Sequence, residues 1–279
     1  MKHFSGKVAA ITGAGSGIGQ ALAVALAAQG CHLAISDLAL ERLDETEALL
    51  NASGVTVSKH VVDVADREAI YAYADAVVET HGRVNLIFNN AGVSLVASFK
   101  DMSDADFNWM MNINFWGVVH GTRAFLPHLQ ASGDGHIVNI SSLFGLLAVP
   151  TQSAYNAAKF AVRGYTEALR MELEMYDAPV SASSVHPGGI RTNIMADGRI
   201  ATQTGLFKDR EKAKRGFDKI AITTAAEAAE IILKGVRKNK RRILVGKDAV
   251  ILDLVQRFFP QGYQKLVTKN ARKTYLDRR

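Results

Sequence analysis

Tyr155 and Lys159 are spaced so that their side chains could share a proton. They lie in the run SAYNAAK, residues 153–159, for which a helix is predicted, and a helix places residues i and i+4 side by side on one face. A free tyrosine loses its proton only near pH ~10, and a cation held nearby favours the phenolate and lowers that pKa. The pair therefore predicts a tyrosine that exchanges a proton near neutral pH.

Ser142 is a third polar group that could meet this pair. It follows the strand-like run His136–Ser141, so its hydroxyl would emerge at a carboxyl end of the sheet, where open α/β folds bind their ligands. The Tyr-x-x-x-Lys spacing also occurs by chance on exposed helices. The function of these three residues thus depends on the elements that would position them.

A glycine-rich loop near the N-terminus is the first of those elements. The apolar strand Lys7–Ile11 is followed by the loop Thr12–Gly19 and by an alanine-rich helix over Gln20–Gln29. Glycines there permit a tight turn and a close backbone approach to a pyrophosphate, and the helix N-terminus offers it free N–H groups. The spacing is T-G-x-x-x-G-x-G, not G-x-G-x-x-G. This order predicts a dinucleotide site, with a purely structural turn as the alternative, and its contacts would come from Gly13, Ser16, Gly17, Ile18 and Gly19.

Together with further segments in the same order, these motifs resemble the short-chain dehydrogenase/reductase superfamily in its single-domain form. The segment Asn89–Gly92 (NNAG) matches the end of that family's fourth strand, and Pro187–Thr192 (PGGIRT) matches its P-G-x-x-x-T segment. The family's catalytic tetrad is matched by Asn114, Ser142, Tyr155 and Lys159. The resemblance covers residues 5–247.

The resemblance implies a reversible hydride transfer between a nicotinamide cofactor and an alcohol or carbonyl. In that reaction Tyr155 would be the acid/base, and Ser142 would orient the substrate oxygen. Lys159 would hold the cofactor ribose and lower the tyrosine pKa, while Asn114 would seat a water in the proton relay. Further cofactor contacts are implied for Asn90, Ala91, Gly92, Tyr155, Lys159, Pro187, Gly188, Ile190 and Thr192.

Such a reaction needs little else from the chain. Hydride delivery to a ketone creates an alkoxide, and a positioned acid typically accelerates such a step by about 10²- to 10⁴-fold. The nicotinamide carries the redox chemistry, so the protein has only to position it and exclude water. We expect no metal, because the eight histidines are scattered and no H-x-x-x-H or C-x-x-C pair occurs.

Asp37 bears on which nicotinamide cofactor is used. It follows the strand-like run Cys31–Ser36, where a carboxylate can accept hydrogen bonds from the adenosine ribose hydroxyls. The same carboxylate would repel a 2′-phosphate, and no Arg or Lys occupies the glycine loop or position 38. NAD is therefore expected in preference to NADP. A solvated strand end is the alternative for Asp37, and the resemblance implies an adenine contact at Asp63 and Val64.

Apolar strands alternate with helical patterns along the chain. This rhythm predicts an α/β fold with a doubly wound parallel sheet (Rossmann fold), about seven strands and helices on both faces. Strands are predicted near residues 8–12, 32–36, 57–62, 86–89, 136–141, 181–186 and 242–246. Helices are predicted near residues 18–29, 40–51, 66–81, 104–130, 154–176 and 225–238.

The composition suits one compact domain. The chain has 279 residues, of which 48% are hydrophobic and 22% charged, enough for a substantial core. The longest uninterrupted apolar run, Ala21–Ala28, is far short of the roughly 20 residues needed to cross a bilayer, and Met1–Lys7 lacks the apolar core of a signal peptide. We therefore expect a cytoplasmic protein.

Two regions depart from a minimal member of the family. Residues 193–222 are a poorly periodic insertion at the family's substrate-lid position, with a disordered loop as the alternative. Beyond the catalytic domain, residues 1–247, the segment 248–279 combines an amphipathic helix over Val250–Phe259 with a basic end. We expect that helix to dock on its own subunit or a neighbour, and a membrane surface is the less favoured partner. Nucleic acid is not expected, because the positive charge collects in this tail instead of lining a patch.

Apolar residues near the reacting groups indicate the substrate class. If the resemblance holds, Phe144, Val149 and Met195 approach the substrate together with Ser142 and Tyr155. Few of the side chains expected there carry a hydrogen-bonding group, so we expect a bulky apolar secondary alcohol or ketone, or an aldehyde. The alternative function is a catalytically silent NAD-binding regulatory protein, against which the intact tetrad argues. The resemblance also implies a homodimer or homotetramer.

Overall fold

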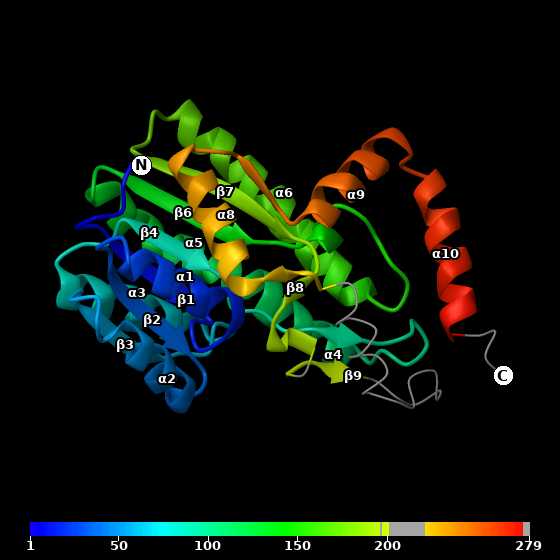
Figure 1. Ribbon diagram of the computed structural model, residues 1–279, viewed down its shortest axis with the longest axis horizontal. Helices are drawn as coiled ribbons and strands as arrows, with labels where there is room; N and C mark the ends of the chain where they lie inside the picture. The colour runs from blue at the N-terminus through cyan, green and yellow to red at the C-terminus, as the bar shows by residue number, and fades with distance from the viewer. Residues whose placement is uncertain (196, 201–220, 276–279) are drawn as a thin grey trace.

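A sheet of seven parallel strands forms the centre of the fold (Figure 1). The computed structural model describes residues 1–195, 197–200 and 221–275. In the described residues the strand order is β11-β7-β6-β4-β1-β2-β3. The strands are β1 (Val8–Thr12), β2 (His32–Asp37), β3 (Val57–Val61), β4 (Leu86–Asn89), β6 (Gly135–Ile140), β7 (Val180–Pro187) and β11 (Arg242–Val245). The predicted doubly wound parallel sheet is confirmed.

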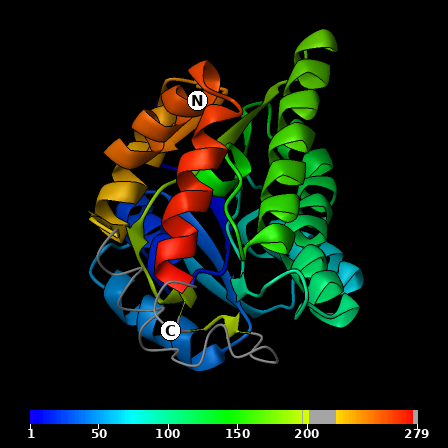
Figure 2. The same cartoon turned by 90° about the vertical axis from the view of Figure 1, so that its right-hand side faces the viewer.

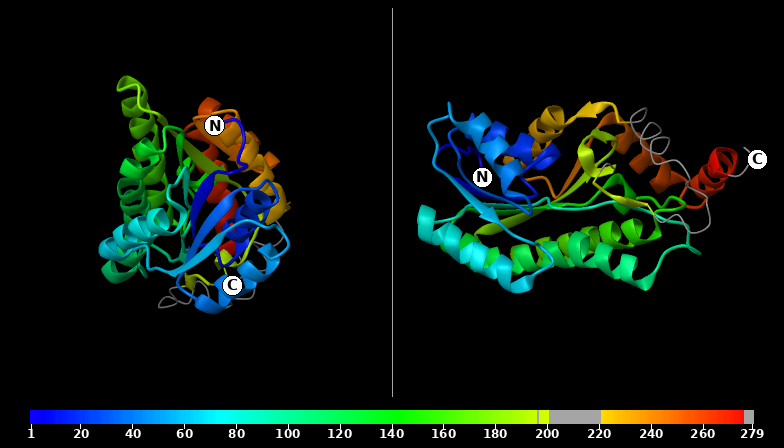
Figure 3. Two further views of the ribbon diagram at one scale, coloured as in Figure 1. Left: turned by 90° about the vertical axis from the view of Figure 1, so that its left-hand side faces the viewer. Right: turned by 90° about the horizontal axis from the view of Figure 1, so that it is seen from below.

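Helices cover both faces of the sheet (Figure 3). One core cluster joins the sheet to α1 (Gly17–Ala27), α2 (Leu40–Leu50) and α8 (Ala225–Arg237). The other joins it to α3 (Arg67–His81), α5 (Gly117–Ala131) and α6 (Ser153–Met175). Strands β1 and β4 are buried along their whole length, as parallel strands covered on both faces must be.

The strand order reverses at β1. The chain adds β2 and β3 on one side of β1 and then crosses to β4 on the other side. Doubly wound sheets bind ligands at such a reversal, beyond the carboxyl ends of the strands. The loop that leaves β1 is the glycine loop and the loop that leaves β4 is the NNAG segment, so the topology brings these two motifs together.

The helix predicted over 104–130 contains an irregular turn. Here α4 (Asp104–Met111) continues into the π-helical turn η1 (Asn112–Trp116) and then into α5. Asn114 lies at the centre of this turn and is fully buried. Single π-turns inside helices frequently lie at functional sites. The hydrophobic pattern did not reveal this turn, because the sequence on either side of it keeps a helical period.

Two small sheets involve the predicted lid, one on either side of it and one that includes residues of the lid itself. β8 (Ile190–Arg191) pairs with β10 (Thr223–Thr224), and β5 (Leu95–Val96) pairs with β9 (Arg199–Ile200). Residues 196 and 201–220 of the lid lie outside the described residues, as does the side chain of Met195. A lid over 193–222 therefore stays a prediction.

The C-terminal segment forms two helices where one was predicted. α9 (Lys247–Phe258) ends before Pro260, as expected, and α10 (Gly262–Tyr275) follows it. Figure 2 shows α10 in red, in front of the sheet and between the two helical layers. The Tyr263 hydroxyl accepts a hydrogen bond from the Ala148 N–H at 3.0 Å, so the start of the basic end is attached to the domain.

The residues that the structure describes leave most of the apolar face of α9 uncovered. The buried residues of α9 are Ala249 and Asp253, and Asp253 forms ion pairs with Arg242 and Arg257. The apolar side chains predicted to dock are exposed, namely Val250, Ile251, Leu254, Phe258 and Phe259. Docking of this face on a neighbour stays a prediction. Among the described residues, no helix combines the length and the apolar character needed to cross a membrane.

Candidate active site

Hydrogen bonds join the glycine loop and the NNAG segment into one unit. The Thr12 hydroxyl accepts from the backbone N–H groups of Asn90 and Ala91, at 3.1 Å each. The Asn90 side-chain amide donates to the carbonyl oxygens of Thr12 at 2.9 Å and Gly13 at 3.1 Å. Two motifs that are distant in sequence thereby form the floor of one site.

Close packing explains two glycines of this floor. Gly13 has a φ of +65°, and a Cβ there would lie 2.8 Å from the Cα of Ala91. A Cβ on Gly19 would collide with the carbonyl oxygen of Gly13. Only glycine combines positive φ with so little room. The loop backbone can therefore approach a ligand closely.

The N-terminus of α1 carries the groups that a pyrophosphate needs. Ser16, the residue before α1, makes no side-chain capping hydrogen bond, and the first turn contains no acidic residue. Free N–H groups at a helix N-terminus bind phosphate groups, and Gly17 and Ile18 begin this helix. Thr192 lies opposite, since a Cβ on Gly17 would be 3.1 Å from the Thr192 methyl group. The cradle and the uncapped helix together fit a dinucleotide.

Asp37 closes β2 and faces the glycine loop. One carboxylate oxygen accepts from the Gly15 N–H at 3.0 Å, and the other accepts from the Ala39 N–H at 3.3 Å. The side chain is partly exposed, so it can accept further hydrogen bonds. Arg42 of α2, which sequence reasoning missed, lies beside this loop and binds Asp197.

Asp63 and Val64 follow β3 at the outer part of the sheet. Asp63 is exposed, and one of its carboxylate oxygens accepts from the Ala65 N–H at 2.9 Å. Val64 is buried against α5, where a Cβ on Gly117 would lie 2.9 Å from a Val64 methyl group. Val64 therefore packs the domain, and an adenine contact at Asp63 and Val64 stays a prediction.

Tyr155 and Lys159 lie one turn apart on α6, as the spacing predicted. Lys159 is buried, and its Nζ donates to the Ile140 carbonyl oxygen at 3.0 Å. The same Nζ lies 5.7 Å from the centre of the Tyr155 ring. Tyr155 is only partly buried. The lysine is therefore the inner group of the pair, and the tyrosine is the outer one.

The pKa values of this pair correct one expectation from sequence. Burial raises the pKa of Tyr155, and the hydrogen bond with the Ser142 side chain partly opposes this. Burial lowers the pKa of Lys159 to about 8. The predicted lowering of the tyrosine pKa is therefore not found in the protein by itself, because removal from water favours the neutral form of both groups.

His186 fixes the backbone of Ser142. Nδ1 of this buried histidine lies 3.0 Å from the Ser142 carbonyl oxygen, which can only accept, so Nδ1 donates. Nε2 then accepts from the Ser184 hydroxyl at 2.9 Å, and burial lowers the pKa of His186 to about 4, which keeps the ring neutral. The Ser142 hydroxyl accepts from the Phe144 N–H at 3.1 Å. Sequence reasoning missed His186. The feature that could have indicated its role was its position just before Pro187 of the PGGIRT segment.

Asn114 uses both ends of its side-chain amide to hold Val93, the residue that follows the NNAG segment. Its Oδ1 accepts from the Val93 N–H and its Nδ2 donates to the Val93 carbonyl oxygen, at 2.8 Å each. A Cβ on Gly92 would lie 3.1 Å from Asn114 Oδ1 and 3.5 Å from Lys159 Nζ. Asn114 therefore anchors this segment next to Lys159. A water held by Asn114 stays a prediction.

Asn156 pins the loop that follows β6. Its side chain donates to the carbonyl oxygens of Phe144 at 2.7 Å and Leu147 at 2.9 Å, and accepts from the Val149 N–H at 3.2 Å. The Phe144 ring meets the Tyr155 ring edge-on, with 6.2 Å between their centres. Phe144 and Val149 are partly exposed. The structure thus brings Phe144 to the tyrosine, and Asn156 was a supporting residue that sequence reasoning missed.

The PGGIRT segment is held by the first turn of α9. The Gly189 N–H donates to Asp248 Oδ2 at 2.7 Å, and a Cβ on Gly188 would collide with the same carboxylate. Pro187 ends β7, and Ile190 is buried in β8. Asp248 belongs to the segment expected to lie beyond the catalytic domain. No local motif marked it as a support of this site.

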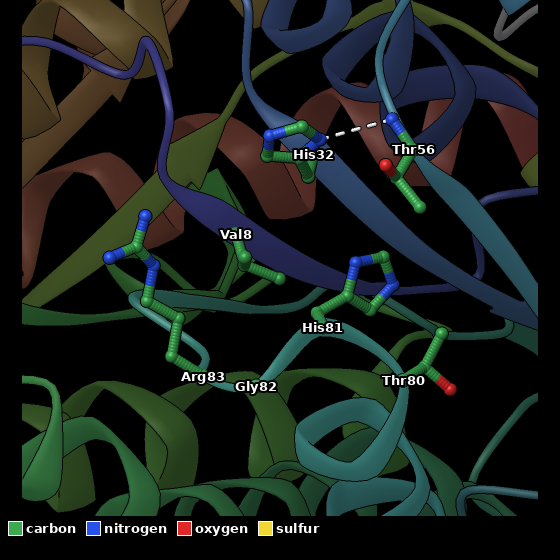
Figure 4. Close-up of a pocket in the computed structure, with 7 residues that line it drawn as sticks. All are labelled: Val8, His32, Thr56, Thr80, His81, Gly82 and Arg83. Atoms are coloured by element: carbon green, nitrogen blue, oxygen red, sulfur yellow. Dashed lines mark hydrogen bonds between the residues drawn. The ribbon is translucent and has the colours of Figure 1, made fainter.

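Polar groups also gather at the opposite end of the strands. A hollow at the amino ends of β1 and β2 (Figure 4) is lined by Val8, His32, Thr56, Thr80, His81, Gly82 and Arg83. There His32 Nδ1 accepts from the Thr56 N–H at 3.0 Å, and none of the predicted site residues takes part. In the part of the chain that the structure describes, no group of three or more His, Cys, Asp or Glu side chains is placed to hold a metal ion.

Known proteins resemble this chain along nearly its whole length. The sequence pattern of the family described as short chain dehydrogenase matches residues 7–202. A protein of Mycobacterium tuberculosis, provisionally named oxidoreductase SadH, is 47% identical over 276 residues, which cover 99% of each chain. The crystal structure of a short chain dehydrogenase/reductase from Burkholderia phymatum in complex with NAD matches with a TM-score of 0.85 and 30% identity, covering 95% of this chain and 97% of that one.

A further similar structure contains a derivative of NADP instead of NAD. An alcohol dehydrogenase from the archaeon Thermococcus sibiricus, complexed with 5-hydroxy-NADP, matches with a TM-score of 0.72 and 26% identity over 86% of this chain and 95% of that one. The fold, the order of the motifs and these similarities agree. This chain therefore belongs to the short-chain dehydrogenase/reductase superfamily and is an NAD(P)-dependent oxidoreductase that acts on CH–OH groups.

Proposed function

We propose that this protein transfers a hydride reversibly between NAD(H) and a bulky apolar secondary alcohol or ketone, or an aldehyde, with Tyr155 as the acid/base. The supporting observation is the hydrogen-bonded pair of the Ser142 and Tyr155 side chains, with buried Lys159 one turn away. When bound, the nicotinamide supplies the hydride chemistry. The chain itself would supply the proton and hold the reacting oxygen.

The proton step follows from these three side chains. In the reducing direction the Tyr155 hydroxyl gives its proton to the developing alkoxide, while Ser142 donates a hydrogen bond to the same oxygen. The phenolate left behind is stabilised by the ammonium group of Lys159. In the oxidising direction the alcohol proton returns to Tyr155. Because burial raises the tyrosine pKa, the phenol is protonated at neutral pH and can act as the acid.

Asp37 supports NAD over NADP. Its carboxylate is fixed by the N–H groups of Gly15 and Ala39, at the place where it would bind the ribose hydroxyls and repel a 2′-phosphate. The Burkholderia relative is bound to NAD and the Thermococcus relative to an NADP derivative. Members of this superfamily thus differ in the cofactor they bind. We assign the preference of this chain for NAD to Asp37.

The surroundings of Tyr155 support an apolar substrate. Phe144 packs edge-on against Tyr155, and Val149 lies in the same loop with part of its surface exposed. We propose Met195 as the third apolar contact. A pocket of this kind gains roughly 25 cal/mol for each Å² of apolar surface that it removes from water, whereas a buried sugar hydroxyl without a partner costs about 1–3 kcal/mol.

A turnover assay tests the function and the substrate class together. Purified protein would be incubated with NAD and secondary alcohols of rising chain length and ring size, beside a panel of polyols, while the absorbance of the reduced cofactor is followed. We expect kcat/KM to rise with apolar bulk. A preference for polyols would overturn the substrate class. Binding of NADH without turnover on any member of the panel would favour the silent regulatory protein.

We also propose a homodimer or homotetramer in which the catalytic domain, residues 1–247, pairs through its long helices. Exposed apolar side chains on η1 and α6 support this assembly, namely Trp116, Phe160, Met171 and Met175. The segment 248–279 would be an addition to that domain. Light scattering on the purified protein measures the assembly, and a monomer at assay concentrations would overturn it.

A further inference from the structure

An ion pair connects α2 with the segment that follows β8. Arg42 donates from Nη1 to Asp197 Oδ2 at 3.0 Å and from Nη2 to Asp197 Oδ1 at 3.2 Å. The two residues are 155 positions apart. Such a two-point contact between a guanidinium and a carboxylate fixes the orientation of both groups. In the structure the partly exposed Arg42 side chain therefore points towards Asp197.

This pair lies at the adenosine-ribose end of the cofactor site. A Cβ on Gly15 would lie 2.6 Å from the Cβ of Arg42 and 2.9 Å from Asp37 Oδ2. Arg42 thus leaves the backbone directly beside the loop that would hold the dinucleotide. Thr192, in the same segment as Asp197, faces Gly17 at the start of α1. Thr192 therefore lies beside the pyrophosphate position, and Asp197 lies on Arg42 next to Asp37 and the glycine loop.

The charges around the ribose position depend on whether the pair is formed. Asp37, Asp197 and Arg42 together carry one net negative charge, and the charge of Glu45 also acts on Arg42. A free arginine beside the ribose is the group that accommodates a 2′-phosphate in NADP sites. Asp197 occupies both terminal nitrogens of Arg42 and adds a second carboxylate near Asp37. Both effects disfavour NADP.

We propose that Asp197 is a specificity-determining residue, which selects NAD over NADP by holding Arg42 in an ion pair and so withholding its guanidinium from a 2′-phosphate. This inference rests on the proposed preference for NAD and adds a second residue to Asp37. It concerns binding of the adenosine end alone. Proton transfer at Tyr155 is unaffected by it, because Arg42 and Asp197 make no contact with the Ser142 and Tyr155 pair.

Dissociation constants of NADH and NADPH test the proposal without requiring turnover. The fluorescence of the reduced nicotinamide would be titrated with wild type, Asp197→Asn, Arg42→Ala and the double variant. Asp197→Asn should tighten NADPH binding roughly tenfold, on the scale of one charge-assisted hydrogen bond, and should leave NADH binding nearly unchanged. In the double variant most of this gain should disappear, because only the smaller effect of the lost repulsion remains. Asp44 lies on the same helix as Arg42 and pairs with Lys59 of β3. Asp44→Asn is therefore the matched control and should change neither constant.

Two results would overturn the proposal. One is an unchanged NADPH dissociation constant in a folded Asp197→Asn protein. The other is a gain that persists in full when Arg42 is also replaced, since the effect would then come from lost repulsion alone. The proposed preference for NAD is tested by the wild type alone, and it would be wrong if the wild type bound NADH no more tightly than NADPH. The double-variant comparison is independent of that outcome.

Discussion

Tyr155 and Lys159 show how burial and charge compete at this site. Removal from water favours the neutral form of each group, which raises the pKa of Tyr155 and lowers that of Lys159 to about 8. The Ser142 side chain acts in the opposite direction on Tyr155. Ser142 and Tyr155 therefore interact directly, whereas the pKa of Lys159 is set by its burial.

Tyr155→Phe should abolish turnover and leave NADH affinity nearly unchanged, because it removes the transferable proton without touching the glycine cradle. Loss of a positioned acid typically costs about 10²- to 10⁴-fold in kcat. Steady-state kinetics and an NADH titration measure the two effects. Tyr165→Phe, at another partly buried tyrosine of α6, is the control. A Tyr155 variant that kept more than roughly a tenth of the wild-type kcat would have lost less than a positioned acid contributes. The acid/base role would then be misassigned.

Lys159 should give the protein an unusual dependence of stability on pH. Folding lowers its pKa from 10.5 to about 8, so between these values the unfolded chain binds more protons and the free energy of unfolding rises with pH. Below about pH 8 the buried ammonium group is a full cost to the fold. Relative to Lys159→Met, the wild type should therefore gain stability as pH rises from about 8 towards 10.5. Urea unfolding of both proteins measures this, and a difference that is constant with pH would contradict it.

Asp37→Ala should narrow the discrimination between NAD and NADP, because it removes a carboxylate that would repel the 2′-phosphate. The ratio of kcat/KM for the two cofactors should fall roughly tenfold, the scale of one lost charged interaction. Asp44→Asn serves as the control for a carboxylate on neighbouring α2. Equal kcat/KM values for NAD and NADP in the wild type would refute the preference itself.

Backbone segments of the candidate site are supported by elements that are distant from them in sequence. β7 holds Ser142 through His186, and α9 holds Gly189 through Asp248. The π-turn η1 holds the NNAG segment through Asn114. The supporting groups are themselves buried or anchored in regular elements, so the site has the rigidity that a proton and hydride transfer requires.

Asn156→Ala should loosen the loop after β6, because it removes the partner of two carbonyl groups and one N–H. An unsatisfied buried polar group costs about 1–3 kcal/mol, so the free energy of unfolding should fall by at least that amount. KM for apolar substrates should rise while the NADH dissociation constant stays unchanged. Asn108→Ala, at an exposed asparagine of α4, is the control. An unchanged KM would show that this loop does not contribute to the substrate site.

The exposed helices at the C-terminus give a prediction about the whole molecule. α9 exposes Ile251 and Phe258, and we expect this apolar face to pack on a neighbouring subunit. Replacing both residues by serine should then lower the oligomeric mass measured by light scattering. Leu49→Ser, at an exposed leucine of α2, is the control and should leave the mass unchanged.

The rival partner of this face is an anionic membrane surface. α10 contains Lys265, Lys269, Arg272 and Lys273 and no Asp or Glu, and cations beside exposed apolar residues suit anionic headgroups. Co-sedimentation with anionic vesicles at low salt separates the two partners. The membrane would be the partner of this face if the Ile251 and Phe258 double variant lost vesicle binding without a change in oligomeric mass. The proposed subunit contact would then be wrong.

Local patterns in the sequence determined the fold class and were enough to predict the main site residues. Hydrophobic periods, glycine spacing and the i, i+4 relation of Tyr155 and Lys159 are properties of residues close along the chain, so they are visible without knowledge of the packing. β1 and β4 accordingly begin and end where they were predicted. The parallel sheet then follows from the alternation of strands and helices.

Only the tertiary structure decided which groups support the site and how they are ionised. Arg42 meets Asp197, and His186 meets Ser142, through the packing of segments that no local pattern relates. The pKa of Lys159 depends on how completely water is excluded from it, and the spacing of the motif carries no information about that. The amphipathic period of α9 likewise predicted an apolar face. Whether other segments cover that face depends on tertiary packing, and those that the structure describes leave most of it exposed.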